Sequence, residues 1–165
     1  MNIFVLDENP ELAARYHCNS HVVKMQLETA QLLSTAYRYY HSEAPENFCY
    51  KATHKQHPCS LWARESRANF VWLVELYYAL EDEWRFRYNH PQTKRHGSYW
   101  VLENITAKNF PVRSMMPDRG LTPFVLAMPD SCKDNNPVLA YRKYYREQKQ
   151  HLLNWGKCER PYWLT

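Results

Sequence analysis

The segment NSHVVKMQLETAQLLSTAYRYYH, residues 19–41, decides the fold because it predicts one long amphipathic helix. At 3.6 residues per turn it covers about six turns. Asn19 or Ser20 is expected to cap the first turn, since a short side-chain oxygen accepts from the free backbone N–H groups there. Apolar residues recur every three or four positions, as on a helix face that packs into a core. They are Val22, Met25, Leu32, Leu33, Ala36 and Tyr40.

The same segment carries an unbroken polar stripe, because a second set of residues also steps by three and four. This set is His21, Lys24, Glu28, Gln31, Thr35 and Arg38. An ordinary solvated helix face would look similar. The mixture of His, Gln and Thr with a single acidic residue instead favours the wall of an active site.

Composition limits the fold and the partners. The chain has 165 residues, enough for one domain with a real core, and it is 45% hydrophobic and 23% charged, as globular proteins are. Only 3 residues are Gly, which argues against a Gly-rich phosphate loop or a many-turned β fold. A net charge of +4 permits a polyanionic partner without requiring one.

The cysteines and the apolar runs bear on location. The 5 Cys residues contain no C-x-x-C pair, which is typical of reduced thiols in a cytoplasm. No apolar run reaches the roughly 18 residues of a membrane span, and the N-terminus lacks the pattern of a signal peptide. We therefore expect a cytoplasmic protein with no membrane partner.

The rest of the chain predicts further helices around the long one. The fold class expected is mainly α, a single-domain bundle of about five helices over residues 1–165, with at most one short strand at residues 3–6. Helices are predicted from Pro10 to about His17, from Leu61 to about Tyr88, from Ser98 to about Ala107, and from Asn136–Pro137 to Gly156. The two longest should pack on each other.

Lys24 and Glu28 are the leading catalytic candidates, with His21 beside them on the stripe. An i, i+4 ion pair on a surface contributes only about 0.3–0.5 kcal/mol and is the ordinary explanation. In a pocket shielded from water, the amine could attack C1′ of a nucleoside or form a Schiff base. The carboxylate could stabilise an oxocarbenium-like sugar or act as a base.

Arg64, Glu65 and Asn69 form a polar patch within the apolar segment 61–88. They could face the Lys24/Glu28 stripe and join the catalytic set. The alternative is a buried polar network that fixes the packing of two helices.

Two basic segments are candidates for nucleic-acid contact. Lys94, Arg95 and His96 form a basic loop, while Arg142, Lys143 and Arg146 alternate with tyrosines that include Tyr145. Phosphate contact combined with base stacking would use these residue types. A solvated helix with half-buried tyrosines is the alternative.

Histidines and a cysteine raise the question of a metal. His17 and His21 are four residues apart, and His54, His57 and Cys59 form a second cluster. Such residues can chelate zinc or iron. Neither cluster has the full spacing of a known metal motif, so packing and helix capping are the simpler interpretation. No metal site is assigned, and no cofactor is expected.

Several segments together resemble a group of small phage-encoded proteins over nearly the whole chain. They are IFVLDENPELAARYHCNSHVVKMQLETAQLLSTA, HPCSLWARES, GLTPFVLAMPD, and AYRKYYREQK followed by W and RPYW. That group is distantly similar to the pyrimidine dimer DNA glycosylases, through an ELA-x-x-x-H start, a carboxylate on an early helix and a C-terminal R-P-x-W. The resemblance implies an all-helical domain that acts on DNA, base excision through an imine to an amine, and a Glu on the early helix.

The chain departs from those glycosylases at residue 2. Their nucleophile is the α-amino group of a small second residue, exposed by removal of Met. Asn2 is too large for ordinary Met removal, so Lys24 becomes the expected substitute.

The leading hypothesis is a DNA base-processing enzyme, of glycosylase or glycosylase/lyase type, acting on damaged or modified DNA. One alternative is a metal-dependent enzyme that uses the His/Cys/Glu cluster. The other is a non-catalytic phage accessory protein that binds nucleic acid or a host protein. A phage-encoded protein would act in the cytoplasm of an infected host cell.

Overall fold

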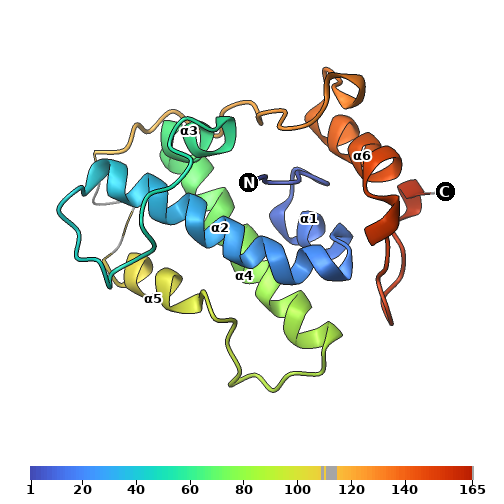
Figure 1. The fold of residues 1–165 in the computed structure, drawn as a ribbon, viewed down its shortest axis with the longest axis horizontal. Helices are drawn as coiled ribbons and strands as arrows, with labels where there is room; N and C mark the ends of the chain where they lie inside the picture. The colour runs from blue at the N-terminus through green and yellow to red at the C-terminus, as the bar shows by residue number, and fades with distance from the viewer. Residues whose placement is uncertain (109, 111–114, 165) are drawn as a thin grey trace.

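The computed structural model describes residues 1–108, 110 and 115–164 (Figure 1). Within these residues the chain forms six α-helices, three short 3₁₀ turns and no strand. The helices are α1 (Pro10–Tyr16), α2 (Asn19–Tyr40), α3 (Pro58–Glu65), α4 (Arg67–Arg87), α5 (Tyr99–Ala107) and α6 (Pro137–Gln148). The predicted mainly α fold is confirmed.

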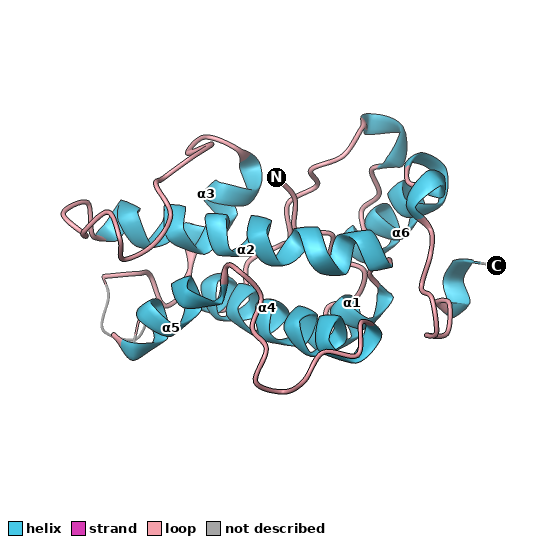
Figure 2. Ribbon diagram, turned by 60° about the horizontal axis from the view of Figure 1, so that its bottom comes forward, coloured by secondary structure: helices cyan, strands magenta, loops and turns pink. Residues whose placement is uncertain are grey.

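The two long helices, α2 and α4, form the centre of the molecule. Figure 2 shows α2 lying across a layer that contains α1, α4 and α5. Fully buried residues of α2 meet those of α4 in one hydrophobic core, and they include Met25, Leu33, Leu73 and Leu76. Burying each such side chain contributes about 1.5–3 kcal/mol, so this contact fixes the positions of the smaller helices around it.

The single helix predicted over residues 61–88 is wrong, because the chain divides at Ser66 into α3 and α4. Ser66 has extended backbone angles, with φ −146° and ψ 156°. Its hydroxyl accepts from the backbone N–H of Asn69 (3.1 Å) and donates to the carbonyl of Gly120 (2.8 Å). A serine that caps a new helix outweighs the uninterrupted apolar pattern around it.

Other helix boundaries also differ from the prediction. Cys18 rather than Asn19 or Ser20 occupies the cap position of α2, and its side chain makes no capping hydrogen bond. The last helix ends at Gln148, well before Gly156. Helix ends depend on a few local hydrogen bonds, which hydrophobic periodicity does not report.

The N-terminal arm, residues 2–6, is buried against the helices. The side-chain oxygen of Asn2 accepts from the backbone N–H groups of Ile3 (2.7 Å) and Phe4 (3.1 Å). Its amide nitrogen donates to the carbonyl of Ala127 (2.7 Å). Phe4 has a positive φ of 37°, which is rare for a bulky residue. The arm is therefore a fixed part of the core, and it brings the start of the chain to the middle of α2.

Candidate functional site

Glu28, in the middle of α2, is the centre of the candidate site. Its side chain is only 14% exposed, and one oxygen accepts from the backbone N–H of Asn2 (Oε2, 3.0 Å). The other oxygen pairs with Lys24 Nζ at 3.3 Å. The carboxylate is thus sheltered, oriented by two nitrogen donors and still open toward the Lys24 side. The predicted pair exists, although the Lys24 side chain is 67% exposed rather than shielded from water.

The start of the chain adds charge to the same place. Partial burial lowers the pKa of His57, and the positive amino group of Met1 lowers it further, while Glu28 acts in the opposite direction. Burial raises the pKa of the Cys59 thiol to about 12, so this cysteine is a neutral thiol at neutral pH. Glu28, Lys24, His57 and the Met1 amino group therefore form one electrostatic neighbourhood.

Sequence reasoning placed neither residue 2 nor His57 beside Glu28. His57 sits there because it caps the N-terminus of α3, where its Nδ1 accepts from the backbone N–H of Cys59 (3.2 Å). Asn2 sits there because the apolar run IFVL anchors the arm in the core. That run was the one signal in the sequence, since a buried arm has to bring its first residues against a helix.

His21 belongs to a different environment from Lys24 and Glu28. It is buried under Phe4, with ring centroids 4.5 Å apart, and its Nδ1 lies 2.5 Å from the hydroxyl of Tyr145. Burial, with smaller contributions from nearby positive groups, lowers its pKa to about 3. The predicted polar stripe is therefore not uniform, and His21 packs in the core instead of lining the site.

The histidines do not make a metal centre with the residues around them. His17 is the C-cap residue of α1, and burial lowers its pKa to about 4. Nowhere in the described part of the chain do three or more His, Cys, Asp or Glu side chains come together as ligands. In particular, the His17/His21 pair and the His54/His57/Cys59 segment do not form a joint set of ligands.

Arg64, Glu65 and Asn69 do not join the Lys24/Glu28 site. Asn69 is fully buried and donates to the carbonyl of Trp62 (2.9 Å) and to the hydroxyl of Thr122 (2.7 Å). Glu65 accepts from the same Thr122 hydroxyl (3.1 Å). Arg64 lies instead over the ring of Tyr39, 4.4 Å from its centroid. Asn69 is thus part of a buried polar network that holds α3, α4 and the segment around Thr122 together.

The basic loop 94–96 is largely engaged with the protein itself. Arg95 pairs with the buried Glu81 (3.5 Å) and lies over the ring of Tyr99 (4.5 Å). His96 Nδ1 lies 2.8 Å from the Ser98 hydroxyl, and burial lowers the pKa of this histidine. Lys94 is exposed over the face of Trp84. Of the three, Lys94 is exposed and forms no ion pair with any carboxylate that the structure describes.

Two of the predicted residues of α6, Arg142 and Tyr145, point inward, whereas Lys143 is half-buried and Arg146 is exposed. Tyr145 is fully buried and Arg142 is only 9% exposed. The Arg142 guanidinium donates to the carbonyl of Leu6 (2.9 Å) and pairs with Asp7 (3.2 Å). Lys143 donates to the carbonyl of Ser131 (2.6 Å), and Arg146 donates to that of Trp163 (3.2 Å). Burial therefore makes Arg142 and Tyr145 unavailable to a nucleic acid at the surface of this fold.

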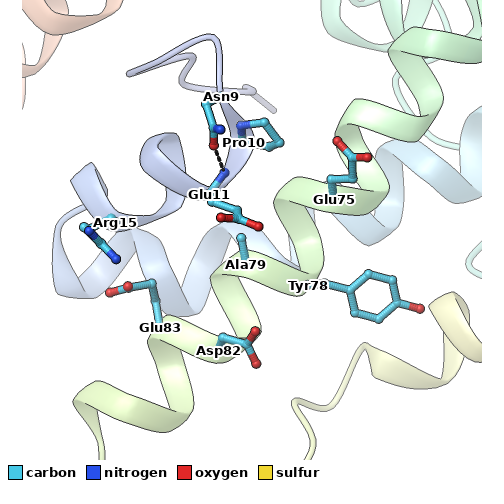
Figure 3. A pocket seen from close by; sticks show the side chains of 9 residues that line it. All are labelled: Asn9, Pro10, Glu11, Arg15, Glu75, Tyr78, Ala79, Asp82 and Glu83. Carbon is cyan, nitrogen blue, oxygen red and sulfur yellow. Dashed lines mark hydrogen bonds between the residues drawn. The ribbon is translucent and has the colours of Figure 1, made fainter.

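A hollow of about 570 Å³ between α1 and α4 is large enough for a ligand but has the wrong charge for DNA (Figure 3). Its lining includes four carboxylates, which Figure 3 shows as sticks: Glu11, Glu75, Asp82 and Glu83. Such a lining repels phosphate groups. None of the predicted site residues lies in it, so volume alone does not identify the site.

Comparison with known proteins gives no match: no family model, no curated protein and no solved structure matches this chain. None of the helices in the described ranges has both the length and the apolar character needed to cross a membrane. The functional argument therefore depends on the geometry around Glu28.

Proposed function

We propose that the protein is a DNA base-processing enzyme, of glycosylase or glycosylase/lyase type, with Glu28 as its central carboxylate. The observation that supports this most directly is a sheltered carboxylate in contact with an amine, since Glu28 lies 3.3 Å from Lys24 Nζ and accepts from the backbone N–H of Asn2, the residue that follows Met1. Damaged or modified DNA is the proposed substrate, and the cytoplasm, of an infected host cell if the protein is phage-encoded, is the proposed location.

The chemistry needs only these two kinds of group. The amine nitrogen forms a bond to C1′ of the nucleotide as the C1′–base bond breaks, and the bonding electrons leave with the base, which takes up a proton. A carboxylate near the sugar stabilises the positive charge that develops on the ring. Cleavage of the C1′–O4′ bond, whose electron pair and a proton go to O4′, and loss of the amine proton then convert the adduct to an imine. Glu28 is within hydrogen-bond reach of Lys24 and can accept that proton.

Two amines compete for the role of nucleophile. Lys24 Nζ is in direct contact with Glu28. The Met1 amino group lies close enough to act on the pKa values of His57 and Cys59, and the next residue donates its backbone N–H to Glu28. An unprotonated amine is required for attack in either case. Lys24 is the one we assign, because its contact with the carboxylate is direct.

Borohydride trapping tests the assignment. Incubation with damaged and modified duplexes in the presence of borohydride should reduce the imine and leave a covalent protein–DNA adduct. Lys24→Gln should abolish the adduct and keep the helix, because Gln is nearly as good a helix former as Lys. Glu28→Gln should slow base release by about 10²-fold or more while the amide oxygen still accepts from Asn2. Glu75→Gln, in the acidic hollow, is the matched control and should retain full activity.

Each outcome has a definite meaning. An adduct that persists in Lys24→Gln and maps to the first peptide would transfer the role to the Met1 amino group, once the intact mass shows that residue 1 carries a free amine. Duplex binding with neither base release nor an adduct would support the accessory-protein alternative. Loss of activity in Glu75→Gln but not in Glu28→Gln would place the chemistry in the hollow between α1 and α4.

A further inference from the structure

A second, smaller pocket lies between the C-terminal half of α2, the loop over residues 42–57 and α3. Its volume is about 280 Å³. Its lining differs from that of the acidic hollow, because among the described residues it contains three cations, three hydroxyl-bearing residues and no carboxylate. The cations are Arg38, Lys55 and Arg64, and the hydroxyls belong to Thr35, Tyr39 and Ser42. We call it the basic pocket.

Arg38 supplies a positive charge that hydrogen bonds hold in a fixed position at the pocket. Its guanidinium donates to backbone carbonyls of the loop, including those of Tyr50 (2.8 Å), Ala44 (2.8 Å), Pro45 (2.9 Å) and Cys49 (3.0 Å). These acceptors are neutral, so they hold the side chain in place without cancelling its positive charge. The loop is thereby folded around an arginine whose charge faces the pocket.

Lys55 and Arg64 add two further charges that remain open. Neither they nor Arg38 form an ion pair with any described carboxylate. Arg64 is positioned by its contact with the exposed ring of Tyr39. In contrast, Lys51 in the same loop is paired with Glu46 at 3.0 Å. Three cations around one pocket, none with a described carboxylate partner, are a favourable arrangement for an anion with several oxygen atoms, such as a phosphate group.

The pocket also lies in line with Glu28. Thr35 follows Glu28 by seven residues on α2, which places both on one face of the helix, about 10 Å apart along its axis. That distance corresponds to about three nucleotide steps along one strand of duplex DNA. A strand with its sugar at Glu28 can therefore place a nearby phosphate at the basic pocket.

We propose that the basic pocket binds a backbone phosphate of the DNA strand whose sugar reaches Glu28. This inference depends on the proposed function for its choice of ligand, and it adds the surface along which the strand is held. Arg64 and Lys55 are the contacting groups, and Arg38 is the fixed charge behind them.

Fluorescence anisotropy with a labelled duplex that carries a tetrahydrofuran abasic analogue tests the proposal. The titrations use Glu28→Gln protein, so that binding is measured without turnover, over about 50–200 mM salt. Adding Lys55→Gln and Arg64→Gln should weaken binding and reduce the slope of log Kd against log salt by between about 1 and 2. The conservative Arg64→Lys should restore most of the slope, since it retains the charge.

Matched controls separate this site from general loss of charge. Lys51→Gln removes a paired cation from the same loop. Arg160→Gln removes an exposed arginine that lies over Trp155, as Arg64 lies over Tyr39. Both should leave affinity and salt slope unchanged. Melting temperatures should agree across the set, because the substituted side chains lie at the surface.

The result also distinguishes this proposal from the proposed function. An unchanged salt slope in Lys55→Gln/Arg64→Gln, or equal losses in the controls, would overturn the phosphate site even if borohydride traps an adduct. A reduced slope without base release or an adduct would support the phosphate site and overturn the enzyme. Absence of any duplex binding by the Glu28→Gln protein would overturn the phosphate site.

Discussion

The α6 region and the basic pocket both combine arginine with tyrosine, and they use the combination in opposite ways. On α6, Arg142 is buried, pairs with Asp7, and lies over aromatic rings that include Tyr16. In the basic pocket, Arg64 lies over Tyr39, a residue that is 60% exposed, and forms no ion pair with a described carboxylate. A basic and aromatic segment therefore indicates nucleic-acid contact only where its charges have no partner within the fold.

The largest expected effect is the loss of stability on breaking the α6 arrangement. Arg142→Ala should lower the free energy of unfolding by about 3–5 kcal/mol, because it leaves Asp7 and the carbonyl of Leu6 without their partner in a largely buried place. Urea unfolding monitored by circular dichroism measures this change. Where the variant remains folded, the salt dependence of duplex binding should equal that of wild type.

Arg64→Gln, in the basic pocket, is the substitution to compare with Arg142→Ala on α6. It should alter the salt dependence of binding and leave the unfolding midpoint within experimental error, since surface substitutions of this kind change stability by less than about 0.5 kcal/mol. The comparison between the two regions would fail if Arg142→Ala reduced the salt slope while Arg64→Gln reduced only stability.

The next largest effect is a loss of folding stability at acidic pH, which arises from two histidines that pack against α6. His17 and His21 are buried beside Tyr145, with pKa values of about 4 and 3 in the folded chain and an ordinary value of 6.5 when unfolded. The unfolded chain therefore binds more protons below pH 6.5, and stability falls as the pH decreases from about 6.5 toward 4. Between pH 7.5 and 5.5 the two histidines together should remove about 3 kcal/mol.

Urea unfolding at the two pH values gives the size of this effect, and the ring protons of both histidines in NMR spectra identify its source. Those resonances should keep their neutral positions down to pH 5. Titration of either ring near pH 6.5 in the folded protein would contradict the assignment, as would a stability that is flat over this range.

Much of the fold was predictable because periodicity reports burial directly. The apolar faces of residues 20–41 and of the segment after Ser66 predicted the α2–α4 packing. The division at Ser66 was not predicted, since it depends on one hydroxyl bond to Gly120, a residue 54 positions away. A helical pattern cannot show which serine has such a partner.

The candidate site was predictable only along the helix. The Lys24/Glu28 pair followed from i, i+4 spacing, whereas the approach of Asn2 and His57 required knowledge of where the arm and the loop fold. The polar stripe gave a wrong expectation for His21. His21 and Glu28 share a line on α2, but His21 faces an aromatic cluster and Glu28 faces the open site. Sequence spacing gives the face of a residue, and tertiary contacts decide whether that face meets water.

The smallest expected effect concerns the aromatic partner in the basic pocket. Tyr39→Leu removes the ring beneath Arg64 and leaves every charge in place. An exposed cation–π contact contributes about 0.5–1 kcal/mol, so duplex affinity should fall by about two- to fivefold. The salt slope should stay as in wild type, because no ion pair with phosphate is lost. A wild-type affinity in Tyr39→Leu would show that Arg64 needs no platform, and a reduced slope would show that the tyrosine had been positioning the charge itself.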